Sequence, residues 1–288
     1  MLDSIERMTF MAALVLYLLS TLLYFVTAAA GQARAAKLAR IAMILGFLLQ
    51  TVCIAARGIH AGRLPLTNQY EFASAFSWGI ALVFLIFIHK YQFDILGAFV
   101  APVIFLVIGY ASMQSKEIHA LMPALQSSWL GFHVCMAIIS YGAFGVAFGV
   151  AGAYLLKSRS AGHADGTAGT AGADSHTSGA ASTSRIPDLE TLDLIIYRAV
   201  ALGFLFLTLC MITGAIWAQR AWGSYWSWDP KETWSLITWF IYAIFLHLHI
   251  NKGMNGRKAA IFALIGFICV IFTYVGVNTL LSGLHSYK

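Results

Sequence analysis

The sequence predicts an all-α fold, a polytopic membrane bundle of about eight transmembrane helices, on two observations. The first is composition: of the 288 residues, 60% are hydrophobic and only 10% are charged. A soluble domain carries about 25% charged residues and about 45–50% apolar ones, so this chain has too few charges to cover a surface exposed to water. The second is the recurrence of apolar runs near the roughly 20 residues that a helix needs to cross a bilayer.

Eight apolar runs are long enough, or nearly long enough, to span a membrane. Because a backbone that faces lipid must satisfy its hydrogen bonds within its own segment, each run is expected to be a helix. The seventh run is short for a span, and Trp234 can extend it. The expected spans are residues 9–30, 38–57, 71–89, 94–112, 131–156, 194–217, 235–251 and 259–281.

The charges between the runs predict the orientation of the bundle. The loops on one side, which include Lys157, Arg185 and Lys252, hold more lysine and arginine than the loops on the other. Such an excess marks the cytoplasmic side of a membrane. It also accounts for the net charge of +6 without nucleic acid as a partner. With eight spans, both termini are expected outside.

Composition also divides the chain into parts. Residues 158–184 are mainly Ala, Gly, Ser and Thr, a composition typical of flexible linkers. The expected organisation is helices one to five in 1–157, a disordered cytoplasmic linker in 158–188, and helices six to eight in 189–288. The four cysteines lie in or beside apolar runs and form no CxxC pair, which favours packing roles over a disulfide framework or a zinc site.

Four segments are expected to meet at the outer face, namely the loops after the second, fourth and sixth spans and the tail after the eighth. The third, residues 222–234, combines tryptophans with charged side chains: Trp222, Trp226, Trp228, Asp229, Lys231, Glu232 and Trp234. One explanation is an aromatic belt at the membrane interface. The other is a shelf for a large, flat, apolar ligand with charged edges, and composition leaves both open.

Two histidines favour the shelf. His133 lies at the outer start of the fifth span and His285 just beyond the eighth, so both are expected beside the tryptophan-rich segment. Imidazole is a common axial ligand of haem iron, and an aromatic shelf can stack on the macrocycle. Cations on the same side are candidates for binding the haem propionates: Arg57, Arg63, Arg220 and Lys231.

A third histidine, His247, lies towards the inner end of the seventh span, and His249 follows two residues later. An ionisable residue within a span is a functional candidate. Two residues along a helix are about 200° apart, so the two side chains cannot bind one iron. Only one of them is expected to face the bundle.

These segments resemble a known family. Residues 222–234, Trp-Gly-Ser-Tyr-Trp-Ser-Trp-Asp-Pro-Lys-Glu-Thr-Trp, resemble the WWD signature of haem-handling membrane proteins. Further segments are similar to CcsA, also called ResC, of system II cytochrome c biogenesis: residues 65–71, 123–127, 276–278 and 283–287. Together with eight spans, they favour CcsA over the shorter CcmC or the longer CcmF.

The resemblance implies a function and its partners. The chain would be the haem-handling subunit of a cytochrome c synthase, acting with a CcsB-type (ResB) protein in the bacterial inner (cytoplasmic) membrane, with its active face periplasmic. It would carry haem b to the outer face and present it, bis-histidine ligated, for thioether attachment to the CxxCH motif of apocytochrome c. A haem transporter or chaperone without ligation activity is the alternative, and a structural membrane subunit with an aromatic belt is a third hypothesis.

The resemblance also implies site residues. His133 and His285 correspond to the outer pair of iron ligands, and His247 to half of an inner site whose other ligand comes from the CcsB component. No catalytic residue is assigned, and Asp229 and Glu232 are candidates for orienting either backbone or haem. The haem-contacting set expected from the WWD segment is Trp222, Trp226, Trp228, Asp229, Glu232 and Trp234.

Overall fold

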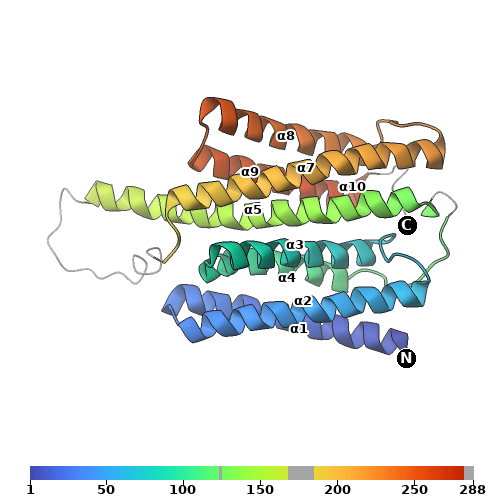
Figure 1. Cartoon of the computed structure of the whole chain (residues 1–288), viewed down its shortest axis with the longest axis horizontal. Coiled ribbons are helices and arrows are strands. Elements are labelled where there is room, and N and C mark those ends of the chain that lie inside the picture. The colour runs from blue at the N-terminus through green and yellow to red at the C-terminus, as the bar shows by residue number, and fades with distance from the viewer. Residues whose placement is uncertain (123–124, 168–184, 282–288) are drawn as a thin grey trace.

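The computed structural model describes residues 1–122, 125–167 and 185–281, with the side chains of 161–167 left out. Within these ranges the chain is helical and contains no strand. Eight helices are long and apolar enough to cross a membrane, so the predicted fold class is confirmed. The helices run side by side in an elongated bundle (Figure 1).

Most spans are single helices. Their bounds are Leu2–Ala30 for α1, Ala33–Ala61 for α2, Gln69–Tyr91 for α3, Ser128–Thr167 for α5, Leu189–Trp222 for α7 and Pro230–Lys252 for α8. In the fourth span, the 3-10 turn η1 (Asp94–Leu96) leads into α4 (Gly97–Ser112). The last span runs through α9 (Arg257–Ile271), the π-helical turn η3 (Phe272–Gly276) and α10 (Val277–Leu280).

Several helices extend beyond the apolar runs that predicted them. The expected seventh span began at residue 235, whereas α8 begins at Pro230. Once a helix has formed, each further residue adds a hydrogen bond at low cost, so polar residues at its ends can continue it. For the same reason α5 continues to Thr167, and the segment expected to be a disordered linker from residue 158 starts as helix. Residues 168–184 of that linker lie outside the described residues.

The helices pack in an order that follows the chain. α1 and α2 form one edge of the bundle, α3 and α4 lie next to them, and α7, α8 and α9 lie on the other side of α5 (Figure 1). The α3–α5 contact depends on small residues, because a Cβ on Gly142 would lie 2.5 Å from the carbonyl oxygen of Gly79. Small residues let membrane helices approach closely and gain van der Waals contact.

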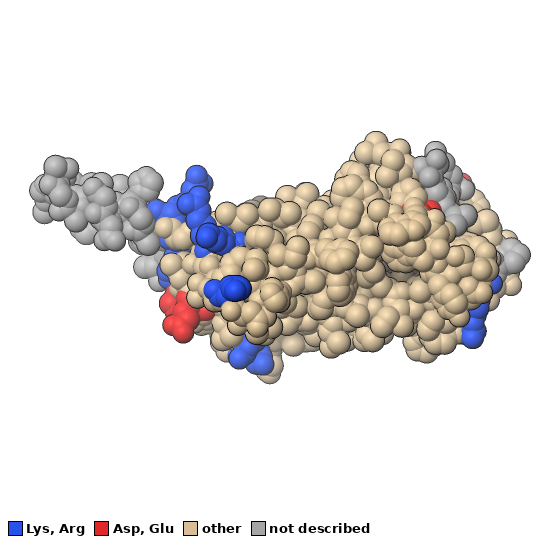
Figure 2. All heavy atoms as spheres, turned by 90° about the horizontal axis from the view of Figure 1, so that it is seen from above, with Lys and Arg blue, Asp and Glu red and all other residues tan. Residues whose placement is uncertain are grey.

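The connections expected on one face lie together. The N-terminus, the α2–α3, α4–α5 and α7–α8 connections and the end of α10 are at the same end of the bundle, which we call the tryptophan end (Figure 1). The tail residues 283–287, expected beside them, lie outside the described residues. Figure 2 shows lysine and arginine gathered towards the opposite end and an uncharged surface over the middle of the visible face, as a lipid-facing surface requires.

Candidate functional site

The tryptophan-rich segment is a short turn between two helices. α7 ends at Trp222, and Gly223 adopts a φ of 77°, a left-handed conformation that glycine takes readily after a helix. α8 begins at Pro230, whose fixed φ suits the first position of a helix. The expectation that 222–234 forms one loop is therefore wrong, because its second part is the first turn of α8.

Asp229 and Glu232 form a capping box at the start of α8. The Asp229 carboxylate accepts a hydrogen bond from the backbone N–H of Lys231 at 3.0 Å. The Glu232 carboxylate accepts from the backbone N–H groups of Ser227 at 2.8 Å and Asp229 at 3.3 Å. A capping box satisfies N–H groups that the start of a helix leaves without partners. Both acids thus orient the backbone, one of the two roles expected of them.

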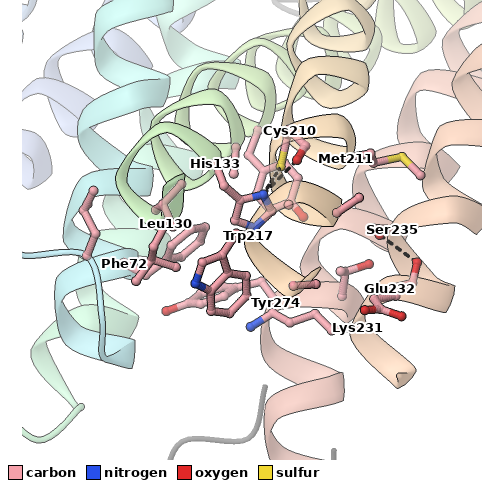
Figure 3. A pocket seen from close by; sticks show the side chains of 18 of the residues that line it. Phe72, Leu130, His133, Cys210, Met211, Trp217, Lys231, Glu232, Ser235 and Tyr274 are labelled. Atoms are coloured by element: carbon pink, nitrogen blue, oxygen red, sulfur yellow. Dashed lines mark hydrogen bonds between the residues drawn. The ribbon is translucent and has the colours of Figure 1, made fainter. Parts of the chain in front are cut away.

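A cleft opens at the tryptophan end between α3, α5, α7, α8 and η3 (Figure 3). It holds about 1310 Å³ of empty space, its open mouth included. Its walls are mainly apolar and aromatic, with Phe72, Leu130, Tyr141, Met211, Trp217, Trp226 and Tyr274. Its polar lining includes His133, Lys231, Glu232, Ser235 and Asn278.

His133 is held against the backbone of α7. Its Nδ1 lies 2.8 Å from the carbonyl oxygen of Cys210, and its ring stacks on Trp217 with centroids 6.1 Å apart. A carbonyl only accepts hydrogen bonds, so in the neutral ring Nδ1 carries the proton and Nε2 the lone pair that binds metal. A Cβ on Gly214 would lie 2.7 Å from Nδ1, so the close approach of the imidazole to α7 requires glycine there.

The structure brings part of the predicted set together. His133, Trp226 and Glu232 line the cleft. Asp229, also expected to contact haem, is buried at the helix cap and does not line it. His285, the second expected outer ligand, lies outside the described residues.

The other three tryptophans of the signature face different neighbours. Trp222 packs edge-on against Trp217 at 4.8 Å, and Trp234 packs against Phe272 at 4.2 Å. Trp228 adopts a φ of 57° and is 69% exposed. None of the three lines the cleft in the described part of the chain. The motif is divided between a helix end, a turn and a helix start, so its side chains point in different directions.

At the opposite end of α8, His249 rather than His247 faces the bundle. The His249 ring stacks on Tyr197 at 4.6 Å, and its Nε2 lies 3.8 Å from the Asp193 carboxylate. His247 is exposed. The expectation that one of the two faces the bundle is confirmed, and His247, the histidine expected to form half of an inner haem site, is the one that faces away. α8 lies at the edge of the bundle, so one of its faces meets no other helix of the described chain (Figure 1).

Three of the four candidate propionate-binding cations have other partners. Arg57 donates to Glu71 Oε1 at 3.0 Å, and Arg63 donates to Glu71 Oε2 at 2.8 Å. The guanidinium of Arg220 lies 5.4 Å from the centre of a tryptophan ring. Of the four, Lys231 alone lines the cleft in the described structure.

Sequence reasoning missed the wall that α7 contributes. Cys210, Gly214 and Trp217 all line the cleft, yet they lie within an expected span, where apolar residues are usually core or lipid-facing. They are spaced by four and three residues, and such positions share one face of a helix. This shared helix face lies at the end of the span that leads into the tryptophan-rich segment, and that is the sequence signal that could have identified the three residues.

Comparison with known proteins agrees with this picture. A family model described as cytochrome C assembly protein matches residues 66–285. The cytochrome c biogenesis protein CcsA of Prochlorococcus marinus (strain MIT 9301) is 35% identical over 292 residues, 98% of this chain and 94% of the relative. CcsA of Guillardia theta is 36% identical over 250 residues, 85% of this chain and 83% of the relative.

The solved structure of cytochrome c heme lyase CcmF is similar in fold. It has a TM-score of 0.71 at 16% identity and covers 99% of this chain, which spans 48% of that protein. The family model matches most of the chain, and curated relatives exceed 30% identity over most of their own length. This multi-pass membrane protein therefore belongs to the cytochrome c assembly protein family, and its relatives there are CcsA proteins.

Proposed function

We propose that this chain is the haem-handling subunit of a cytochrome c synthase, which presents haem b for attachment to the CxxCH motif of apocytochrome c. The observation that carries the proposal is the cleft, where His133 and several aromatic side chains meet beside the WWD segment. The names of the relatives, cytochrome c biogenesis protein and cytochrome c heme lyase, support a role in cytochrome c biogenesis.

The cleft residues fit haem as a substrate. Haem has a flat apolar ring, an iron that binds imidazole axially and two carboxylates at one edge. The aromatic walls suit the ring, and Nε2 of His133 suits the iron. In addition, the indole Nε1 of Trp226 is buried and has no hydrogen-bond partner in the described structure. Buried donors nearly always have a partner, so this one favours a polar ligand.

We assign the second axial position to His285, in the tail that follows α10. His247 marks a separate site. It lies 17 residues after Pro230 in α8, about 25 Å along the axis at about 1.5 Å per residue. Because His247 is exposed within a span, its side chain can be reached from lipid or from another membrane protein. This supports a shared inner haem site with a CcsB-type partner.

The contribution of this chain to the reaction is positioning. His133 is fixed by the Cys210 carbonyl and the Trp217 ring before any ligand arrives. Holding haem beside the thiols of an apocytochrome replaces a chance encounter by an oriented one, for which effective molarities are very large. One imidazole of the pair must leave the iron when the histidine of CxxCH binds it.

The test is co-expression with a CcsB-type partner and a reporter apocytochrome. We expect the purified complex to show a Soret absorbance and the reporter to keep haem after denaturation, because a thioether bond survives unfolding. A Soret band without covalent haem on the reporter would instead favour the transporter or chaperone alternative. A complex without Soret absorbance would contradict haem handling and favour the third hypothesis, a structural membrane subunit.

We further propose that the tryptophan end faces the periplasm of a bacterial inner membrane. Support comes from the lysines and arginines gathered towards the opposite end (Figure 2), which is the bias of cytoplasmic loops. Alkaline phosphatase is active only outside the cytoplasm. Fusions after about residue 225 should therefore be active and fusions within 158–184 inactive. The reverse pattern would contradict this orientation.

A further inference from the structure

Lys231 places a positive charge in the cleft beside a neutral partner. Its Nζ donates a hydrogen bond to Asn278 Oδ1 at 3.2 Å. Figure 3 shows the side chain running along the cleft beneath Trp217. Among the described residues, no carboxylate forms an ion pair with it. A partly buried ammonium without an anion is costly, so this position favours an anionic ligand.

The carboxylates near Lys231 in the chain accept hydrogen bonds from groups other than its ammonium. Asp229 accepts the backbone N–H of Lys231 rather than its ammonium. Glu232 accepts the N–H groups of Ser227 and Asp229 together with the Ser227 hydroxyl. The capping box that starts α8 therefore engages both carboxylates in hydrogen bonds to other groups, and Asp229 acts on the lysine charge only through space.

Two further groups surround the Lys231 ammonium or lie in the same cleft. Asn278 Nδ2 donates to the carbonyl oxygen of Tyr274 at 2.6 Å, which directs its Oδ1 towards Lys231. Tyr274 belongs to the π-helical turn η3, and π turns occur frequently at functional sites. Trp226 lines the same cleft, and its Nε1–H is buried and has no partner in the described structure.

We propose that Lys231, held by Asn278, and the indole N–H of Trp226 form a carboxylate-binding subsite of this cleft. The ligand class is a carboxylate on the edge of a flat aromatic molecule, and for haem this is a propionate. The inference rests on the proposed function and deepens it, because it states which edge of haem lies against α8. Lys231 thus takes the propionate-binding role that was expected of Arg57 and Arg63, whose guanidinium groups are paired with Glu71.

The test compares two probes, ferric haem b and haem b dimethyl ester, titrated into the purified full chain. A hydrogen bond to a charged group contributes about 1.5–3 kcal/mol, or about 10- to 100-fold in affinity. We therefore expect the wild-type chain to bind haem about 10- to 100-fold more tightly than the ester. Lys231→Met should lose most of this preference and keep only the part that the Trp226 N–H contributes, whereas Lys231→Arg should keep most of it.

Two more variants keep the test decisive if Lys231→Met fails to fold. Trp226→Phe removes the N–H but keeps a ring, and should reduce the preference about tenfold. Lys116→Met removes an exposed cation at the same end, away from the cleft, and should leave the preference unchanged. Equal wild-type affinity for both probes would overturn the subsite and leave haem binding intact. If neither probe binds, the proposed function fails and the subsite with it.

Discussion

Replacing His133 with glycine is expected to abolish haem binding at the cleft. Losing only an outer partner of a metal ligand costs about 10- to 100-fold in affinity, so losing the ligand itself should cost at least about 100-fold. The glycine leaves a space bounded by Trp217 and the Cys210 carbonyl, which free imidazole can enter. Added imidazole should therefore restore the Soret band and part of the maturation of a reporter cytochrome.

The chain offers a matched control for this variant. His119 also lies at the tryptophan end, but its side chain is 76% exposed beside Glu117. His119→Gly should mature the reporter like the wild type. Gly214→Ala keeps His133 but adds a methyl group 2.7 Å from Nδ1, and should cause an intermediate loss, about 10- to 100-fold. Wild-type maturation by His133→Gly without imidazole would show that the outer site is assigned wrongly.

Replacing Glu71 with glutamine is expected to cause the largest loss of stability. The buried Glu71 carboxylate accepts hydrogen bonds from Arg57, Arg63 and the backbone N–H and hydroxyl of Thr67. Removing one partner from a buried ion pair costs about 3–5 kcal/mol, because it leaves charge without compensation. Thr67 lines the cleft, so haem affinity should fall as well.

Unfolding by denaturant in detergent micelles measures this effect. Glu117→Gln is the control, since the Glu117 carboxylate is 76% exposed and exposed pairs contribute at most about 1 kcal/mol. The free energy of unfolding should fall by about 3–5 kcal/mol for Glu71→Gln and stay nearly constant for Glu117→Gln. Equal effects of the two substitutions would mean that the buried network does not stabilise the tryptophan end.

The fold could be predicted because lipid leaves few choices. A chain with so few charges and regular apolar runs must form spanning helices. Because successive spans cross the membrane in opposite directions, every second connection lies at the same end. Helix ends were predicted less well. α8 starts in the middle of the tryptophan-rich segment because Asp229 and Pro230 are a cap and a first helical residue, a signal that hydropathy does not contain.

The site could be predicted in part, by the same reasoning. The topology brought His133 to the tryptophan-rich segment, and both meet at the cleft. Which side of α8 faces the bundle could not be derived, since the positions of its neighbours decide between His247 and His249. The pairing of Arg57 with Glu71 across α2 and α3 likewise depends on packing, so composition could not single out Lys231 among the cations.

The effect of a one-residue deletion in the last span depends on the position of the π turn. η3 closes its hydrogen bonds one residue later than an α-helical turn does. Deleting a single codon within η3 would remove the extra residue and leave an ordinary α-helical turn, with the later residues nearly in place. Deleting a codon in α9 instead would rotate every later residue by about 100° relative to the start of the helix and shift it by about 1.5 Å. Asn278 would then turn away from Lys231, although the hydropathy profile would hardly change. A one-residue deletion in α9 can thus inactivate the protein while leaving a gene that still reads as an intact eight-span membrane protein.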